Sequence, residues 1–311
     1  MKAAYIEQYG GTDAIKIVND YAKPAPGPGQ VLVKVQAVSL NRIDTILRAG
    51  YMHQMMPLHF PSVLAGDFAG VVAEVGEGVT GFNVGEEVYG HAGALSGGSG
   101  ALAEFTVVST TKLAKKPATI SVVEAASLPL TAASAVQAIE EHIALQRDQK
   151  ILIHGGTGGI GTIAIQLAKH HGAYVATTVD GQFASLAKEL GADEVIDFKT
   201  QDFTTIIKDY DAVLVTAADA AAGSYGVLKK DGVLVLLAGM VDESAATTHE
   251  VTAIQQMTQT NSMQLQRIAL LADSGVIKPL VEKTFNFEEA KKAYDYFEAE
   301  HPKGKVVVTI D

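Results

Sequence analysis

The chain has 311 residues, of which 48% are hydrophobic and 19% charged, and its formal net charge at pH 7 is −11. This length and composition predict a folded protein of two domains rather than a disordered chain. The acidic balance argues against nucleic acid and against an anionic membrane as partners, because both call for a basic surface. The lack of cysteine in the sequence excludes disulfides, thiolate zinc sites and a cysteine nucleophile.

The first residues, Met-Lys-Ala-Ala-Tyr, do not form the apolar core of a signal peptide. Apolar runs along the chain also stay short of the ~18 residues that a membrane span requires. We therefore expect a soluble protein and predict a cytoplasmic location.

Residues 1–117 alternate short β-rich pieces with turns rich in Gly and Pro. Examples are the strand-like segments "QVLVKVQAVSL" and "GVVAEVGEGV" and the turn "KPAPGPGQ". This pattern is typical of an antiparallel, barrel-like domain.

Residues 118–261 alternate strand-like and helix-like segments. The apolar runs are "KILIH", "AYVATTV", "EVIDF", "DAVLV" and "GVLVLLAG". Short apolar runs separated by helical stretches predict buried parallel strands with crossover helices. This part of the chain is therefore expected to be a doubly wound α/β domain.

Residues 262–311 begin with a predicted helix in "SMQLQRIALLADSG" and a short strand near "LVEKTF". Asn286 with Glu289 has the pattern of a cap for a helix that runs through Glu300. The terminal "GKVVVTI" alternates like an edge strand, and we expect it to return to the first domain. The predicted domains are therefore 1–117 with 262–311, and 118–261.

The stretch "IHGGTGGIGTIAIQLAK" contains G-x-G-x-x-G between the predicted strand 150–154 and a predicted helix that starts inside the motif. The first glycine allows a tight turn, the second lets the backbone approach a pyrophosphate, and the third lets helix pack on strand. The helix N-terminus adds free N–H groups and a partial positive charge. A glycine-rich turn without a ligand is the alternative, but the surrounding alternation favours a dinucleotide site. The residues assigned to it are Gly156, Thr157, Gly158, Gly159, Ile160 and Gly161.

The same stretch, with Gln166 and Lys169 after the glycines, resembles the quinone oxidoreductase, or zeta-crystallin-like, branch of the medium-chain dehydrogenase/reductases. Segments that resemble this branch in the same order include "VSLNRIDTILRAGY", "PSVLAGDFAGVVAEVGEGVTGFNVGEEVYG", "VEAASLPLTAASAVQAI", "LAKELGADEVIDF" and "VLKKDGVLVLLAG". The closing "GVIKPLVEKTFNFEEAKKAYDYFEAEHPKGKVVVTI" is similar too, so the resemblance covers almost the entire chain.

The resemblance implies an α/β fold: a GroES-like β-barrel catalytic domain completed by the C-terminal segment, and a Rossmann doubly wound parallel sheet between. Such proteins typically bind NADP(H), work without zinc, form homodimers, and reduce quinones or α,β-unsaturated carbonyls at a cleft where the domains meet. We expect the apolar segment "GVLVLLAG" to be the edge that pairs across a dimer axis.

Zinc-dependent relatives carry a Cys near position 39 and a Gly-His-Glu near position 66. This chain has Ser39 and the tripeptide Gly66-Asp67-Phe68 instead. A structural zinc lobe built on four cysteines cannot form here, and the nine histidines are scattered along the chain. No metal site is expected.

Cofactor choice depends on the loop that follows the strand "AYVATTV". Asp180 stands close to where an acid would bind a ribose 2′-OH and repel a 2′-phosphate, and Thr178 aligns with the acid of NAD-dependent relatives. The contacts by which NADP-binding relatives often hold the phosphate are missing, and Lys199 is the one nearby cation in the sequence. Asp180 as a helix cap is the alternative. Kinship places NADP(H) first and NAD(H) second.

The resemblance carries over further cofactor contacts at strand ends, where ligands bind in this architecture. Ser134 corresponds to a position near the nicotinamide ribose. Thr216 follows the strand "DAVLV", and Ala238 and Gly239 would lie along the nicotinamide.

The sequence has no G-x-S-x-G elbow, which argues against a hydrolase, whereas hydride transfer requires little beyond positioning. Asn41 and Asp44 in "LNRID" match the family element "NPVD". Asn41 is assigned a polar contact with nicotinamide or substrate carbonyl, with a loop-closing role as the alternative, and Asp44 is expected to cap its helix. Tyr51 corresponds to a cleft tyrosine that could donate to a carbonyl, or could pack against "MHQMMP". His53, Met55 and Met56 are expected to shape the pocket mouth. A histidine here could supply a proton, but surface histidines outnumber catalytic ones, and water is the alternative source.

These observations predict an NAD(P)H-dependent reductase that transfers a hydride to a quinone or an α,β-unsaturated carbonyl without zinc. A catalytically idle dinucleotide-binding sensor or structural protein is one alternative. An NAD(H)-linked alcohol dehydrogenase is another.

Overall fold

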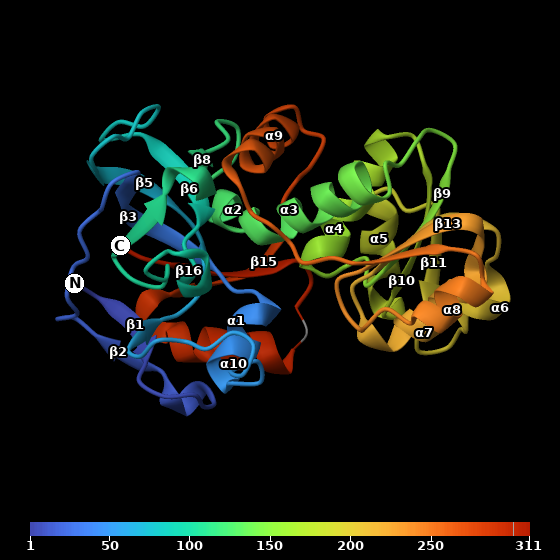
Figure 1. Ribbon diagram of the computed structural model, residues 1–311, viewed down its shortest axis with the longest axis horizontal. Coiled ribbons are helices and arrows are strands. Elements are labelled where there is room, and N and C mark those ends of the chain that lie inside the picture. The colour runs from blue at the N-terminus through green and yellow to red at the C-terminus, as the bar shows by residue number, and fades with distance from the viewer. Residues whose placement is uncertain (301) are drawn as a thin grey trace. The chain divides into compact units, whose positions relative to one another are not determined.

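The computed structural model describes residues 1–300 and 302–311 and divides into two compact units (Figure 1). The first unit comprises Met1–Leu130, Thr260–Ser274 and Pro279–Asp311, and the second comprises Thr131–Gln259 and Gly275–Lys278. The first boundary lies later than the predicted one at residue 117, because helix α2 (Val122–Ala126) contacts strands of the first unit.

The first unit is built on a seven-stranded sheet in the order β15-β16-β3-β5-β6-β8, with β7 paired to β3. Neighbouring strands are antiparallel except β15 and β16, which are parallel. The strands are β3 (Gln30–Ser39), β5 (Asp67–Val75), β6 (Glu87–His91), β7 (Phe105–Ser109), β8 (Leu113–Lys115), β15 (Val281–Asn286) and β16 (Lys305–Thr309). This is the antiparallel, GroES-like barrel that the sequence predicts.

A smaller antiparallel sheet, in the order β2-β1-β4, completes the first unit. Its strands are β1 (Ala3–Ile6), β2 (Lys16–Val18) and β4 (Ser62–Val63), and the helices of the unit are α1 (Arg42–Ala49), α2, α9 (Ser262–Asp273) and α10 (Ala290–Ala299). One apolar core joins β3, β5, β16 and α10, for example through Val35, Phe68, Tyr294 and Val306. Residues far apart in sequence therefore share one core, which fixes the strand ends described below.

The C-terminal strand returns to the first unit, as predicted, but it is not an edge. β16 lies between β15 and β3, and four of its five residues, Lys305 to Val308, are buried. The alternation in "GKVVVTI" concerns the faces of the strand. It cannot reveal that a second strand, β15, bonds to the backbone edge opposite β3. The predicted helix after Asn286 is also present, as a single 3-10 turn (Phe287–Glu289) followed by α10.

The second unit contains a six-stranded, wholly parallel sheet in the order β11-β10-β9-β12-β13-β14. Its strands are β9 (Lys150–His154), β10 (Tyr174–Val179), β11 (Glu194–Asp197), β12 (Tyr210–Val215), β13 (Leu228–Leu236) and β14 (Thr252–Gln255). Helical crossovers connect them: α4 (Gly159–His170), α5 (Ala184–Glu189), α6 (Phe203–Ile206), α7 (Ala221–Ser224) and α8 (Glu243–Thr248) (Figure 1). The predicted Rossmann, doubly wound sheet is confirmed.

The strand order reverses at β9, which is flanked by β10 on one side and β12 on the other. Ligands of such sheets bind beyond the carboxyl end of the strand where the order reverses. The glycine motif follows β9 directly, so the fold places it at this switch point.

The segment "GVLVLLAG" forms the end of β13, which is paired on both sides, with β12 and with β14. The prediction that it is the exposed pairing edge is wrong. Its apolar run reflects burial inside the sheet, and β14 is the edge strand on that side. Among the described residues, none of the helices is long and apolar enough to cross a membrane.

Candidate active site

The glycine turn between β9 and α4 is tightly packed at two of its three motif glycines. A Cβ at Gly156 would lie 2.0 Å from Oγ1 of Thr177, and a Cβ at Gly161 would lie 2.2 Å from the carbonyl oxygen of Gly155. Gly155 itself has φ +70°, in the left-handed region that favours glycine. The first and third glycines therefore allow the turn and the close packing of helix on strand, as predicted.

Gly158 differs from its neighbours. For a Cβ at Gly158, the nearest atom among the described residues would be the carbonyl oxygen of Gly155, at 3.4 Å, which is an ordinary contact. Gly158 is the N-cap of α4, and a glycine cannot offer a capping side chain to the first N–H groups of the helix. A glycine here leaves those N–H groups open to an anion, and this is the geometry that fits a dinucleotide pyrophosphate.

The glycine turn is supported from below by hydrogen bonds among residues at the carboxyl ends of three strands. The carbonyl oxygen of Thr178 accepts from the N–H groups of Gly155 and Gly156, each at 3.1 Å. Oγ1 of Thr216 donates to the carbonyl oxygen of His154 at 2.6 Å. These bonds join β9, β10 and β12 directly beneath the glycines.

His154 belongs to this hydrogen-bonded support of the turn, and the sequence reasoning missed it. Its Nδ1 lies 3.0 Å from Oγ1 of Thr178 and its Nε2 lies 3.1 Å from Oγ of Ser224. Burial lowers the pKa of His154 to about 4, so the imidazole is neutral at pH 7. The sequence places His154 as the last strand residue before the glycines, and this position could have indicated that its side chain lies beneath the turn.

Thr178 is buried, and its hydroxyl faces His154 under the turn. Its side chain supports the glycine turn, and its assignment to the ribose stays a prediction.

Asp180 lies in the loop after β10 and is the N-cap of the 3-10 turn Gly181–Phe183, where it accepts from the N–H of Gln182 at 3.3 Å. The capping role is therefore confirmed. Its carboxylate is also 2.6 Å from Nζ of Lys199 and 2.9 Å from Nε2 of Gln182. The hydrogen bonds from Lys199 and Gln182 lower the pKa of Asp180, which is thus ionised and paired.

The remaining predicted cofactor residues also lie in the second unit. Ser134, in helix α3 (Pro129–Val136), is buried, and its Oγ lies 2.8 Å from Oγ1 of Thr258. Thr216 follows β12, and Ala238 and Gly239 follow β13. Because the strands are parallel, the glycine turn, Asp180, Thr216 and Ala238–Gly239 all follow strand ends at one edge of the sheet. Their contact with a cofactor stays a prediction.

In the first unit, Asn41 is the N-cap of α1, and its N–H donates to Oδ2 of Asp44 at 2.8 Å. Asp44 therefore caps its helix, as predicted. The Asn41 side chain donates through Nδ2 to Oδ2 of Asp67 at 2.9 Å and accepts at Oδ1 from Nζ of Lys305 at 2.5 Å. Both ends of the amide are engaged inside the unit, and contact with a nicotinamide or substrate stays a prediction.

Asp67 is the centre of a buried polar network that the sequence reasoning did not assign. Its exposed fraction is 0%, and it accepts from Asn41, from the N–H of Leu130 at 3.0 Å and from Nδ1 of His91 at 2.7 Å. We refer to Asn41, Asp67, His91 and Lys305 as the Asp67 network. Burial raises the pKa of the adjacent Asp44 to about 7, and burial lowers the pKa of Lys305 to about 8. Two groups whose pKa lies near neutrality, Asp44 and Lys305, thus lie close to this network.

Tyr51 follows α1 and is 84% exposed within its unit. This exposure contradicts the alternative in which it packs against the next residues and leaves its hydroxyl accessible. His53, in the same turn, donates from Nδ1 to the carbonyl oxygen of Gly50 at 2.8 Å. Whether Tyr51 or His53 touches substrate stays a prediction.

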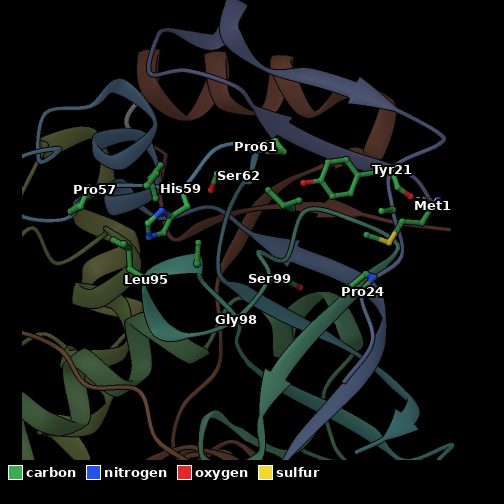
Figure 2. A pocket seen from close by; sticks show the side chains of 14 residues that line it. Met1, Tyr21, Pro24, Pro57, His59, Pro61, Ser62, Leu95, Gly98 and Ser99 are labelled. Atoms are coloured by element: carbon green, nitrogen blue, oxygen red, sulfur yellow. Dashed lines mark hydrogen bonds between the residues drawn. The ribbon is translucent and has the colours of Figure 1, made fainter. Parts of the chain in front are cut away.

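The first unit also contains an apolar cavity of about 360 Å³, shown in Figure 2. Met1, Tyr21, Pro57 and Leu95 are among its lining residues, and His59 brings the one imidazole of that lining. Neither predicted catalytic residue, Asn41 or Tyr51, lines it. We therefore do not assign it to the active site.

Within residues 1–300 and 302–311, no group of three or more His, Asp or Glu side chains is arranged to hold a metal ion. Ser39, at the position of the cysteine in zinc-dependent relatives, is buried.

Two family models match the chain: "Alcohol dehydrogenase GroES-like domain" over residues 27–118 and "Zinc-binding dehydrogenase" over residues 190–308. A quinone oxidoreductase of Triphysaria versicolor is 31% identical, and the match covers 99% of this chain and 98% of the relative. The NADPH-dependent alkenal/one oxidoreductase of Arabidopsis thaliana is 34% identical over 99% of this chain and 79% of its own length. The structure of the quinone oxidoreductase from Coxiella burnetii is similar with a TM-score of 0.89 at 30% identity, covering 100% of this chain and 99% of that one.

Proposed function

We propose that this chain, which belongs to the quinone oxidoreductase branch of the medium-chain dehydrogenase/reductase superfamily, reduces quinones or α,β-unsaturated carbonyls with NAD(P)H. The observation that carries the proposal is the glycine turn at the switch point of the parallel sheet. A Cβ at Gly158 would make only an ordinary contact there, and the first N–H groups of α4 receive no capping side chain from this residue. The relatives named above are quinone and alkenal/one oxidoreductases, which supports the two substrate classes.

The residues of the second unit would hold the cofactor. The N–H groups of the turn would bind the pyrophosphate, and Ser134, Thr216, Ala238 and Gly239 would contact the nicotinamide half of the cofactor. When bound, the reduced nicotinamide supplies the hydride. The protein's part is to orient the substrate, exclude water and provide the proton.

NADP(H) is the favoured cofactor and NAD(H) the second candidate. The Arabidopsis relative is NADPH-dependent by name, and Lys199 brings a cation to the loop that follows β10 in this chain. A 2′-phosphate would compete with Asp180 for the Lys199 ammonium, whose side chain is 58% exposed. The negative charge of Asp180 repels the 2′-phosphate, whereas the positive charge of Lys199 attracts it. Together the two residues set the degree of preference between NADPH and NADH rather than an absolute choice.

On the substrate side, the exposed Tyr51 hydroxyl donates to the carbonyl oxygen as negative charge develops on it. Asn41 acts through the Asp67 network, because both ends of its amide are already engaged. For a quinone, the same donor stabilises the developing hydroquinone oxygen.

The reaction is proposed to need no zinc, although one matching family is described as zinc-binding. That match covers residues 190–308, whereas the positions at which zinc-dependent relatives are expected to carry ligands hold Ser39 and the segment Gly66–Phe68. The Asp67 carboxylate is also occupied by three hydrogen-bond donors. A hydroxyl and an engaged carboxylate are a poor zinc donor set. Turnover that survives prolonged chelation, with no zinc in the elemental analysis, is the expected result.

We further propose a cytoplasmic homodimer that pairs through the β14 edge (Thr252–Gln255). β14 ends the six-stranded sheet, and Met257 just beyond it is 63% exposed. An open strand edge beside an exposed apolar side chain favours pairing between copies. Sedimentation velocity on the purified protein tests it, and a monomer at micromolar concentration would contradict it.

The first experiment is a titration of NADPH and NADH into the purified protein at matched ionic strength, followed by turnover on a panel of quinones and enones. Binding of NADPH with consumption in the presence of an acceptor supports the proposal. A catalytically idle sensor would bind the cofactor without consuming it, and an alcohol dehydrogenase would oxidise alcohols with NAD⁺. Binding of neither nucleotide would contradict the assignment of the glycine turn.

A further inference from the structure

His91 and Asp67 form a carboxylate–imidazole pair at the ends of two neighbouring strands. His91 is the last residue of β6 and Asp67 the first of β5, and they are directly opposite in the antiparallel register. Opposed residues of a sheet project to the same face, so the backbone itself brings the two side chains together. Nδ1 of His91 lies 2.7 Å from Oδ1 of Asp67.

Two glycines leave the space for the imidazole. A Cβ at Gly66 would meet Cε1 of His91 at 2.3 Å, and a Cβ at Gly93 would meet Nε2 at 2.7 Å. Any side chain at either position would displace the ring. The imidazole is therefore held in one place by its surroundings as well as by its carboxylate.

The hydrogen-bond pattern fixes which nitrogen carries the proton. Oδ2 of Asp67 accepts from the Asn41 amide and from the N–H of Leu130, and both of these groups can only donate. The carboxylate thus accepts at Oδ1 from Nδ1–H of His91. Among the described residues none hydrogen-bonds to Nε2 of His91, this atom keeps some access to solvent, and the side chain is 13% exposed. Nε2 is the outward end of the pair.

The charges around His91 favour its protonated form. Burial by itself lowers the pKa of His91, but the hydrogen bond and the charge of Asp67 outweigh burial, and the charge of Asp44 adds to them. Lys112 acts in the opposite direction. The net pKa is raised above the ordinary value of histidine, which is the state a proton donor needs near neutral pH.

His91 is connected to Asn41, which the sequence assigned to the site, through the carboxylate of Asp67. Hydrogen bonds run from Lys305 to Asn41, from Asn41 to Asp67 and from His91 to Asp67. The outward Nε2 of His91 is therefore one end of a hydrogen-bonded network that includes Asn41, the N-cap of α1. With Nδ1 bonded to Asp67 and the side chain 13% exposed, Nε2 of His91 is placed to pass a proton outward.

We propose that His91 is the proton donor of the reduction and that Asp67 is its positioning residue. The inference rests on the proposed function. Reduction of an enone needs a hydride at the β-carbon, which the cofactor supplies, and a proton. As the C=C electron pair moves toward the carbonyl oxygen, the Nε2–H bond of His91 breaks and its proton forms the new O–H bond, which tautomerises to the saturated ketone. The neutral imidazole then regains a proton from water, and a quinone takes the proton on its oxygen in the same way.

The test combines a titration of the free protein with kinetics. NMR follows the His91 imidazole in the protein without cofactor, where its pKa should exceed the ordinary value and should fall in Asp67→Asn. The turnover number for an enone is then measured against pH for the wild type, His91→Gln, His91→Gly and the control His249→Gln, an exposed histidine of the second unit.

The expected wild-type turnover number falls as pH rises through the pKa that NMR assigns to His91. His91→Gln should lose roughly 10²-fold in turnover number and lose this pH dependence, with an unchanged Kd for NADPH. Free imidazole should restore part of the activity of His91→Gly, an effect that a merely structural histidine would not show. The His249 variant should behave as the wild type.

A His91→Gln variant with the wild-type rate and pH profile would overturn the inference. So would a wild-type turnover number that stays constant across the range in which His91 titrates, a result that needs no variant to fold. Failure of the proposed function is distinct from both, because the wild type would then bind NADPH and consume none with any quinone or enone.

Discussion

Two alanine substitutions in the glycine turn should have opposite consequences, although they add the same methyl group three residues apart. Gly161→Ala should destabilise the second unit and Gly158→Ala should leave stability nearly unchanged while it weakens cofactor binding. The difference arises because Gly161 is packed against the backbone of the turn, whereas a Cβ at Gly158, the N-cap position, would make only an ordinary van der Waals contact.

The contacts give the size of each effect. At Gly161 the new Cβ would lie 2.2 Å from the carbonyl oxygen of Gly155 and 2.7 Å from Cα of Gly156, so backbone must shift. Overpacking costs about 1–3 kcal/mol, and a contact this close to backbone belongs at the upper end of that range. Because alanine gains about 1 kcal/mol over glycine in a helix, we expect a net loss of about 2 kcal/mol. Gly158 has φ −78° and ψ 172°, an extended conformation open to any residue, and we expect a change within about 0.5 kcal/mol.

Urea unfolding measures the stability of each variant, and fluorescence titration measures its Kd for NADPH. A methyl group at Gly158 would separate the pyrophosphate from the helix N–H groups, and a tenfold rise in Kd, or about 1.4 kcal/mol, is the smallest change we expect. Wild-type affinity in Gly158→Ala would refute the assignment of this turn to the pyrophosphate. Wild-type stability in Gly161→Ala would refute the packing argument.

Three further predictions concern the loop charges, the exposed tyrosine and the buried histidine. Lys199→Ala should weaken NADPH binding more than NADH binding, and Asp180→Asn should strengthen NADPH binding, because the 2′-phosphate is attracted by Lys199 and repelled by Asp180. Equal changes in affinity for both nucleotides would speak against this. Tyr51→Phe should lower the turnover number for an enone by roughly 10²-fold, and an unaltered rate would remove Tyr51 from the mechanism. The pKa of His154 is about 4 when folded against 6.5 ordinarily, so the unfolded chain binds more protons between these values and stability falls as pH falls. The loss should be about 2 kcal/mol between pH 7 and pH 5, measured by urea unfolding, and His154→Gln should show a smaller pH slope.

Much of the second unit could be predicted from the sequence because its signals are local. The strand Lys150–His154 and the helix start inside the glycine motif lie where the sequence predicts them. Buried parallel strands leave continuous apolar runs, and a turn that crowds backbone against backbone requires glycine. Both constraints act within about twenty residues, so a short window of sequence carries them.

The order of the strands could not be predicted in this way. The end of β13 was expected at an edge and lies inside the sheet, and β16 was expected at an edge and is covered by β15. An apolar strand shows that its faces are buried, but its sequence does not show how many neighbours bond to its backbone. The first boundary differs from the prediction for a related reason, since helix α2 packs on strands of the first unit, such as β3 (Gln30–Ser39) and β5 (Asp67–Val75), that lie far from it in the sequence.

The sequence by itself determined the family, the two kinds of sheet and the glycine cradle, because resemblance, periodicity and turn chemistry can be read along the chain. Only the tertiary structure decided which polar side chains meet. Lys305 and Asn41 are separated by 264 positions, and Asp67 and His91 by 24, yet hydrogen bonds join all four residues in one buried network. Their contact follows from strand register and core packing, which depend on the whole chain at once, and it is there that the proposed proton donor lies.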